Sequence, residues 1–108
     1  MAELSIVIPT LNEKESIGQC ITEINDALEG SGIDAEIIVC DNSTDETPEI
    51  AKRLGAQVVV PDRMGYSYAV AVGIERSSGE YIFLSDADGT YPVTDLTPFI
   101  EPLRKGEA

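Results

Sequence analysis

Apolar residues occur along the chain in four short runs that are rich in β-branched side chains. The runs cover residues 4–9, 36–40, 56–60 and 80–85, and Pro9 closes the first. Short apolar runs of this kind predict buried strands. Because apolar residues follow one another in the runs instead of alternating with polar ones, both faces of the strands should be covered.

Between these runs, apolar residues recur at three- and four-residue steps, which is the spacing of one helix face. We expect Asn12 to cap the first helix. Thr47 should cap the second helix, with Pro48 in its first position, and the third helix should span residues 65–77. The apolar face of the first helix comprises Ile17, Cys20, Ile21, Ile24 and Leu28. That of the third comprises Tyr66, Ala69, Val70 and Ile74.

The alternation of strands and helices predicts an α/β fold, a three-layer Rossmann-like parallel sheet with helices on both faces. We expect the first strand to lie centrally, with the fourth on one side and the second and third on the other, which gives the strand order 3-2-1-4. In such sheets ligands bind beyond the carboxyl ends of the strands. Polar and acidic residues follow three of the predicted strands, so one rim of the sheet is the expected site.

The composition narrows the possible partners. The chain has 108 residues, enough for one small domain, and 20 acidic residues against 7 basic ones. A net charge of -13 opposes binding to nucleic acid or to anionic lipid. Such acidity is typical either of an ordinary solvated surface or of a protein in a salt-rich cytosol, and both interpretations stay open. Without histidine, a Ser-His-Asp triad is impossible.

Cys20 lies on the apolar face of the first predicted helix, and Cys40 ends the second predicted strand. Two such cysteines predict buried free thiols in a reducing compartment. The chain has no apolar run near the roughly 20 residues of a membrane-spanning helix, and its start lacks the basic residues of a secretory signal. These observations predict a cytoplasmic location.

Asp86 and Asp88 leave the fourth predicted strand two residues apart, so their side chains should point to the same side. Two adjacent carboxylates suit Mg²⁺ or Mn²⁺, which bridge carboxylates to substrate phosphates. The alternative for this pair is a solvated turn. Asp41 can accept a hydrogen bond from a uracil or guanine ring or serve in a turn. Arg63 can meet a phosphate at the start of the third helix or be an ordinary surface arginine.

Three segments, residues 4–13, 36–45 and 79–88, together resemble the inverting nucleotide-sugar glycosyltransferases of family 2, which have the GT-A fold. Residues 89–92, Gly-Thr-Tyr-Pro, are similar to the dolichyl- and polyprenyl-phosphate sugar synthase branch. The resemblance implies that the nucleotide-binding residues are Pro9, Asn12, Glu13, Asp41, Arg63 and Asp86. It also implies that Asp86 and Asp88 bind the metal and that Asp41 contacts the base. Cys40 stands where the family often has the first of two aspartates.

The resemblance implies a sugar transfer from a UDP- or GDP-sugar to an acceptor such as polyprenyl phosphate, assisted by Mg²⁺ or Mn²⁺. Family domains are longer, so residues 1–108 are expected to be the nucleotide-sugar-binding half, truncated before the acceptor half and inactive alone. No residue matches the family's catalytic base, so the catalytic residue is unknown. The parent protein is expected in the cytoplasm or at the cytoplasmic membrane face, and the fragment is expected to form a homodimer through its fourth strand.

The alternative is a nucleotide-binding module without turnover or a nucleotidyltransferase-like domain, because one fold hosts many functions. A nucleotidyltransferase would show a glycine-rich, basic loop after its first strand. This chain has Thr10, Leu11, Asn12 and Glu13 there, which favours the glycosyltransferase.

Overall fold

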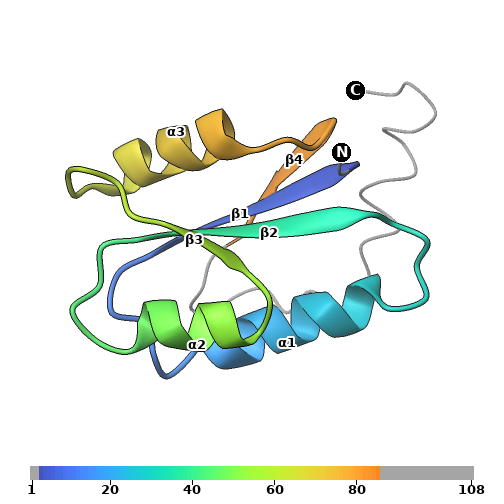
Figure 1. Cartoon of the computed structure of the whole chain (residues 1–108), viewed down its shortest axis with the longest axis horizontal. Coiled ribbons are helices and arrows are strands. Elements are labelled where there is room, and N and C mark those ends of the chain that lie inside the picture. Colours follow the sequence, from blue (N-terminus) through green and yellow to red (C-terminus); the bar gives the residue numbers. More distant parts are fainter. Residues whose placement is uncertain (1–2, 86–108) are drawn as a thin grey trace.

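Strands and helices alternate along the chain in a computed structural model, which describes residues 3–85 (Figure 1). The strands are β1 (Leu4–Thr10), β2 (Ala35–Asp41), β3 (Gln57–Val59) and β4 (Tyr81–Leu84). The helices are α1 (Ile17–Leu28), α2 (Thr47–Arg53) and α3 (Tyr66–Arg76). The predicted alternation is confirmed, and each end of each strand lies within one residue of its expected limit.

The four strands form one parallel sheet in the order β3-β2-β1-β4, as predicted. Every residue of the central strand β1 is buried. Ile6 lies opposite Ile37 of β2, and Thr10 lies opposite Asp41 at the carboxyl end. The register therefore brings the residues that follow β1 and β2 to the same rim of the sheet.

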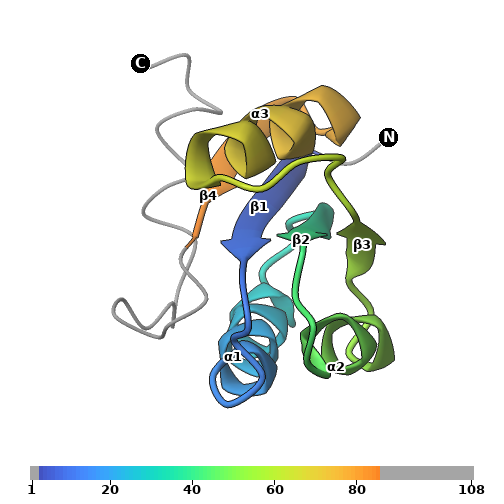
Figure 2. The ribbon, with the colours of Figure 1, turned by 90° about the vertical axis from the view of Figure 1, so that its left-hand side faces the viewer.

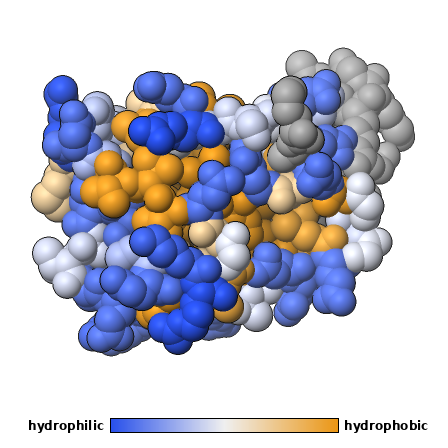
Figure 3. Space-filling model, in the orientation of Figure 1, coloured by the Kyte–Doolittle hydropathy of each residue, from blue (hydrophilic) through white to orange (hydrophobic). Residues whose placement is uncertain are grey.

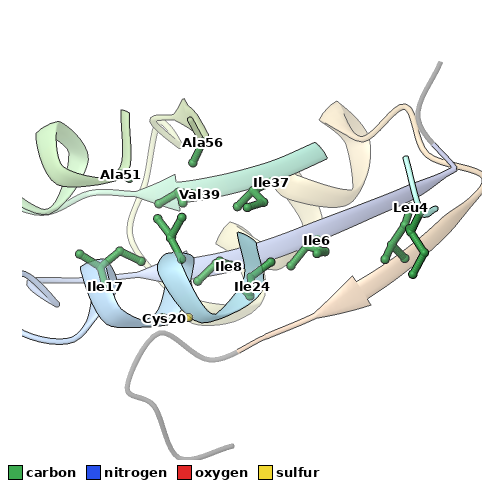
Figure 4. Close-up of a cluster of buried hydrophobic side chains, with 12 residues drawn as sticks. Leu4, Ile6, Ile8, Ile17, Cys20, Ile24, Ile37, Val39, Ala51 and Ala56 are labelled. Atoms are coloured by element: carbon green, nitrogen blue, oxygen red, sulfur yellow. The ribbon is translucent and has the colours of Figure 1, made fainter. Parts of the chain in front are cut away.

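Helices cover both faces of the sheet, with α1 and α2 on one side and α3 on the other (Figure 2). The larger core lies against α1 and α2 and contains Ile6, Ile8 and Val39 (Figure 4). Because successive strand residues point to opposite faces, Val7 and Cys40 belong instead to the smaller core with Ala69 of α3. Both cysteines are buried and free, as expected.

The cap predicted for the first helix is wrong. Asn12 has φ 53, and its Oδ1 accepts a hydrogen bond from the backbone N–H of Thr44 at 3.0 Å. Because the Asn12 Oδ1 bonds to the loop after β2, it is not available to cap the helix. The helix begins at Ile17, whose backbone N–H donates to Glu13 O at 2.8 Å.

The second helix also begins differently from its prediction, because its cap position falls on Glu46, which makes no side-chain capping bond, and not on Thr47. The Asp45 Oδ1 accepts a hydrogen bond from the Thr47 backbone N–H at 2.9 Å, and another from the Thr47 hydroxyl. The hydroxyl bond is the main cause that holds the pKa of Asp45 below its usual value. Thr47 is the first residue of the helix, followed by Pro48 as expected.

The predicted apolar face of the third helix is correct only in part. Ala69 is buried, but Tyr66 is 62% exposed and Ile74 is 44% exposed. The helix instead buries Gly73, where an added Cβ would lie 2.4 Å from Val7 Cγ1 and 2.9 Å from Cys40 Sγ. The missing side chain lets α3 approach the sheet closely. Tyr66 lies on the same side of α3 as Ala69 and Gly73, but it is the first residue of the helix and lines the pocket at the rim.

Glu36 of β2 joins four segments at the amino-terminal edge of the sheet, away from the carboxyl ends of the strands. Its carboxylate accepts hydrogen bonds from Ser5 Oγ, from Ser78 N at 2.6 Å and Oγ at 2.9 Å, and from Gln57 Nε2 at 3.3 Å. Burial by itself raises the pKa of Glu36, but these hydrogen bonds outweigh it and hold the pKa below its ordinary value. The carboxylate therefore fixes the α3–β4 turn to the sheet.

Candidate functional site

A pocket of about 300 Å³ lies at the carboxyl ends of β1 and β2, below the start of α3. Figure 2 looks onto this rim, with the tip of β1 and the first turn of α3 near the viewer. The lining residues are Pro9, Thr10, Leu11, Glu13, Cys40, Asn42, Met64, Gly65, Tyr66 and Ala69. A concave pocket at this edge is where parallel α/β sheets bind ligands.

Apolar groups make up much of this pocket. Cys40 is fully buried, and burial raises the pKa of its thiol, so this part of the wall is uncharged. Leu11, Met64 and Tyr66 project from the surrounding loops and are largely exposed. Large apolar side chains that surround a pocket and remain exposed to water are typical of a ligand-binding surface.

Asp41 lies beside the pocket but does not line it. The side chain is 2% exposed. Its Oδ1 accepts hydrogen bonds from the hydroxyls of Ser43 and Thr10, the latter at 2.7 Å, and its Oδ2 accepts one from Ser43 N at 3.1 Å. The carboxylate thus holds the loop after β2 to the end of β1, and its contact with a base stays a prediction.

Of the three residues predicted around the end of β1, Pro9 lies within the strand and Asn12 and Glu13 follow it. Pro9 and Glu13 line the pocket, whereas Asn12 does not. Asn12 joins the loops, since its N–H donates to Ser43 Oγ at 2.7 Å and its Oδ1 accepts from Thr44 N. Glu13 N donates to Thr47 Oγ1 at 3.0 Å, which adds a second link between the loops.

Arg63 belongs to the loop before α3 and lies outside the pocket lining. Its guanidinium carbon is 4.7 Å from the centroid of the Tyr68 ring, a cation–π contact. The Tyr68 hydroxyl donates to Asp62, and this bond is the main cause that raises the pKa of Tyr68. The Arg63 carbonyl accepts a hydrogen bond from Asn42 Nδ2 at 3.1 Å, which ties this loop to the end of β2.

Sequence reasoning missed Asn42, Met64 and Tyr66 as site residues. The spacing of Tyr66 fits the buried face of α3, but the side chain is exposed at the pocket. A signal was present in Gly65, which has φ 129 and sits between two large apolar residues. Apolar residues beside a glycine at a helix start suit a ligand wall as well as a core.

The predicted metal ligands Asp86 and Asp88 lie outside the described residues. Within residues 3–85, no group of three or more acidic or cysteine side chains could hold a metal ion. Ser85, the last described residue, donates its N–H to Val7 O at 3.0 Å. The chain thus leaves β4 beside the carboxyl half of β1.

Solved structures of two sugar transferases share this fold. Mannosyl-3-phosphoglycerate synthase from Rubrobacter xylanophilus matches with a TM-score of 0.81 and 25% identity, over 94% of this chain and 36% of that one. Glucosyl-3-phosphoglycerate synthase from Mycobacterium tuberculosis, solved with Mn²⁺, UDP and glucosyl-3-phosphoglycerate, matches with a TM-score of 0.76 and 32% identity, over 94% and 39%. The predicted fold class is confirmed: this is the N-terminal part of a GT-A glycosyltransferase fold.

The comparison of sequences identifies the family. Residues 5–108 match the model of glycosyl transferase family 2, and the chain belongs to that family. The low-salt glycan biosynthesis hexosyltransferase Agl6 of Haloferax volcanii is 48% identical over 105 residues, which are 97% of this chain and 25% of that protein. The dolichyl-phosphate hexose transferase of the same organism is 33% identical over 104 residues, 96% of this chain and 44% of that protein.

The chain therefore spans a quarter to less than half the length of these two relatives. The family match confirms the expected family and disfavours the nucleotidyltransferase-like alternative. The described residues contain no helix that is both long and apolar enough to cross a bilayer.

Proposed function

We propose that the pocket binds the nucleoside of a UDP- or GDP-sugar and that the whole protein transfers the sugar to an acceptor, polyprenyl phosphate. The observation that carries this proposal is the pocket itself, at the shared carboxyl edge of β1 and β2, with both apolar walls and polar groups. Leu11, Met64 and Tyr66 offer apolar surface to the flat faces of a base. Polar groups such as Glu13 fix its orientation.

The start of α3 is the proposed place for the diphosphate. Gly65 precedes the helix and lines the pocket, and the first backbone N–H groups of a helix have no partner within it. These groups and the helix dipole attract phosphate. Arg63, two residues before Gly65, would add a positive charge on this side if it left the Tyr68 ring.

A cation is proposed because the protein and its donor are both anionic. The net charge of -13 repels a nucleotide sugar, and a divalent ion offsets that repulsion locally. Asp86 and Asp88 offer the hard oxygen ligands that Mg²⁺ and Mn²⁺ prefer. The ion would stabilise the charge that develops on the departing diphosphate.

The remainder of the protein is proposed to supply the acceptor site and the catalytic base. Residues 1–108 would then form the donor half-domain, which binds nucleotide but transfers no sugar alone. We place the parent in the cytoplasm, at the membrane face where a polyprenyl phosphate is available. For the isolated chain we propose a homodimer, since Ile82 and Leu84 of β4 are exposed beside an edge that pairs only with β1 among the described strands.

Calorimetric titration tests the proposal. The 108-residue chain and the longer parent are titrated with UDP, GDP and their sugars, with and without Mn²⁺. We expect binding to both proteins that is strengthened by Mn²⁺, and sugar transfer to polyprenyl phosphate by the parent alone. Absence of nucleotide binding by the parent would refute the donor site, and transfer by the 108 residues would refute the proposed division of labour.

A further inference from the structure

A cluster of hydrogen-bonded residues at the amino-terminal edge of the sheet holds the start of β4. Its members come from β1, β2 and the α3–β4 turn, and they are Ser5, Glu36, Ser78 and Gly79. We propose that this cluster, the β4 anchor, sets the register of β4 and thereby positions Asp86 and Asp88 for the metal. This inference rests on the proposed function, which assigns the metal to these two aspartates.

The side chains of β4 do not decide its register, because all four of them are apolar. Tyr81 and Phe83 are half-buried against the larger core, whereas Ile82 and Leu84 are 41% and 47% exposed. A shift by one residue would exchange the two pairs between the faces of the sheet. Since neither pair is fully buried, that exchange would cost little hydrophobic burial, and other contacts have to select the register.

The hydrogen bonds of the β4 anchor select it. Ser5 is fully buried, and its hydroxyl donates to Glu36 and accepts a hydrogen bond from the Gly79 N–H at 2.7 Å. Glu36 also accepts hydrogen bonds from Ser78 N at 2.6 Å and from Ser78 Oγ at 2.9 Å. A shifted strand would bring other groups of the turn to these acceptors, and the buried hydroxyl would lose a partner at a cost in stability.

Gly79 selects the same register by its size. A Cβ at this position would lie 2.5 Å from Ser5 N and 2.5 Å from Ser5 Oγ. The nitrogen belongs to the backbone of the central strand, which is buried throughout and cannot move aside. A shift by one residue would put Ser78 or Glu80 in this place, and both carry a Cβ. Only the observed register puts a glycine where the two backbones approach closely.

The register determines where the chain leaves β4. Leu84 lies opposite Val7, and the Ser85 N–H donates to Val7 O at 3.0 Å. Asp86 is the next residue in the sequence, so a shift by one residue would displace the aspartates by about 3.3 Å relative to β1. The pocket would be less affected, because no described residue of β4 lines it. The β4 anchor should therefore act on metal-dependent binding and not on the nucleoside pocket.

These two properties can be measured separately in the parent protein. Calorimetry gives the affinities for UDP and GDP, with and without Mn²⁺, for the parent and for Ser5→Ala, Glu36→Ala and Gly79→Ala. The factor by which Mn²⁺ raises the affinity should fall roughly tenfold in these variants, as is typical when groups that orient metal ligands are removed. The affinity without Mn²⁺ should stay unchanged. Glu36→Gln should keep most of the Mn²⁺ effect, since its amide oxygen can still accept hydrogen bonds from Ser5 and Ser78.

Ser31→Ala is the matched control. The Ser31 hydroxyl also donates one hydrogen bond and accepts another, to Leu28 O at 2.7 Å and from Ile33 N at 3.1 Å, but these partners belong to the end of α1 and the loop after it. This variant should change neither affinity. Amide hydrogen exchange adds a measurement that needs no ligand: residues 81–85 should exchange faster in the three anchor variants, relative to residues 38–40 of β2, and as in the parent in Ser31→Ala.

The outcomes distinguish this inference from the proposed function. Thermal unfolding shows which variants are folded, and Ser5→Ala, which removes one oxygen atom, decides the matter if Gly79→Ala does not fold. If the folded variants keep the full effect of Mn²⁺, or if their affinities with and without Mn²⁺ fall by the same factor, the positioning role is wrong while the donor site stands. If the folded parent binds neither nucleotide, the proposed function fails and the role in metal binding fails with it, whereas unchanged hydrogen exchange in β4 would refute the anchor itself.

Discussion

Replacing Gly73 by alanine should destabilise the protein, although alanine is the better helix former. The added Cβ would lie 2.4 Å from Val7 Cγ1 and 2.9 Å from Cys40 Sγ. Neither side chain can give way easily, because both are fully buried, and Val7 is β-branched and lies on the central strand. The helix must therefore move away from the sheet.

The expected magnitude is a balance of two effects. Overpacking a well-packed core costs about 1–3 kcal/mol, and glycine to alanine in a helix recovers about 1 kcal/mol. The net loss should lie between about 0 and 2 kcal/mol in the free energy of unfolding, and the 2.4 Å contact places it near the upper limit, about 2 kcal/mol. For a domain of this size that corresponds to a fall in Tm of roughly 8–16 °C. Because Ala69 lies one turn earlier in α3 and lines the pocket, nucleotide affinity should fall as well.

Thermal and urea unfolding of two further variants check the reasoning. Gly18→Ala on α1 is the matched control, since its Cβ would meet Ile50 Cγ2 at 3.5 Å, an ordinary contact. It should be neutral or stabilise by up to about 1 kcal/mol. Adding Val7→Ala to Gly73→Ala should cost less than the sum of the two single changes, because the new methyl fills the space vacated. Equal stability of the two glycine variants, or additive losses in the double variant, would refute the close-approach argument.

Glu36→Gln should lower stability at neutral pH and remove an acid-sensitive part of it. A carboxyl group whose pKa is lowered in the folded protein stabilises the fold at pH values above its ordinary pKa, here 4.5, and this contribution is lost as the pH falls through the folded pKa. The stabilities of variant and parent, measured by urea titration, should therefore differ least below pH 5. Asp88→Ala should abolish Mn²⁺-dependent donor binding without lowering Tm. Asp26→Ala, which changes an exposed aspartate on α1, is the control and should leave donor binding unchanged. Unchanged affinity in Asp88→Ala would contradict the metal assignment. The isolated chain should be dimeric at micromolar concentration in light scattering and become monomeric with Leu84→Glu; a monomer throughout would exclude pairing through β4.

The parallel sheet could be predicted because continuous apolar runs that alternate with helical segments are typical of strands covered on both faces. The errors arose where a contact distant in sequence decided the outcome. Asn12 has the residue type of a helix cap, but Thr44, on another loop, takes its oxygen. Tyr66 has core spacing, but it is the first residue of α3 and lines the pocket at the rim of the sheet. The burial of Asp41 likewise depends on Thr10, which lies 31 residues away.

The hydrogen bonds at the rim also determine which walls of the pocket can move independently. The loops after β1 and β2 are joined through Asn12 at Ser43 and Thr44 and through Glu13 at Thr47. The segment before α3 is attached to them by a side-chain hydrogen bond from Asn42. The loops after β1 and β2 should therefore move as one unit, whereas residues 64–66, on the other wall of the pocket, can move separately. Amide hydrogen exchange should therefore be faster in residues 64–66 than in the loops after β1 and β2. Figure 3 shows apolar surface across the middle of the face seen in Figure 1.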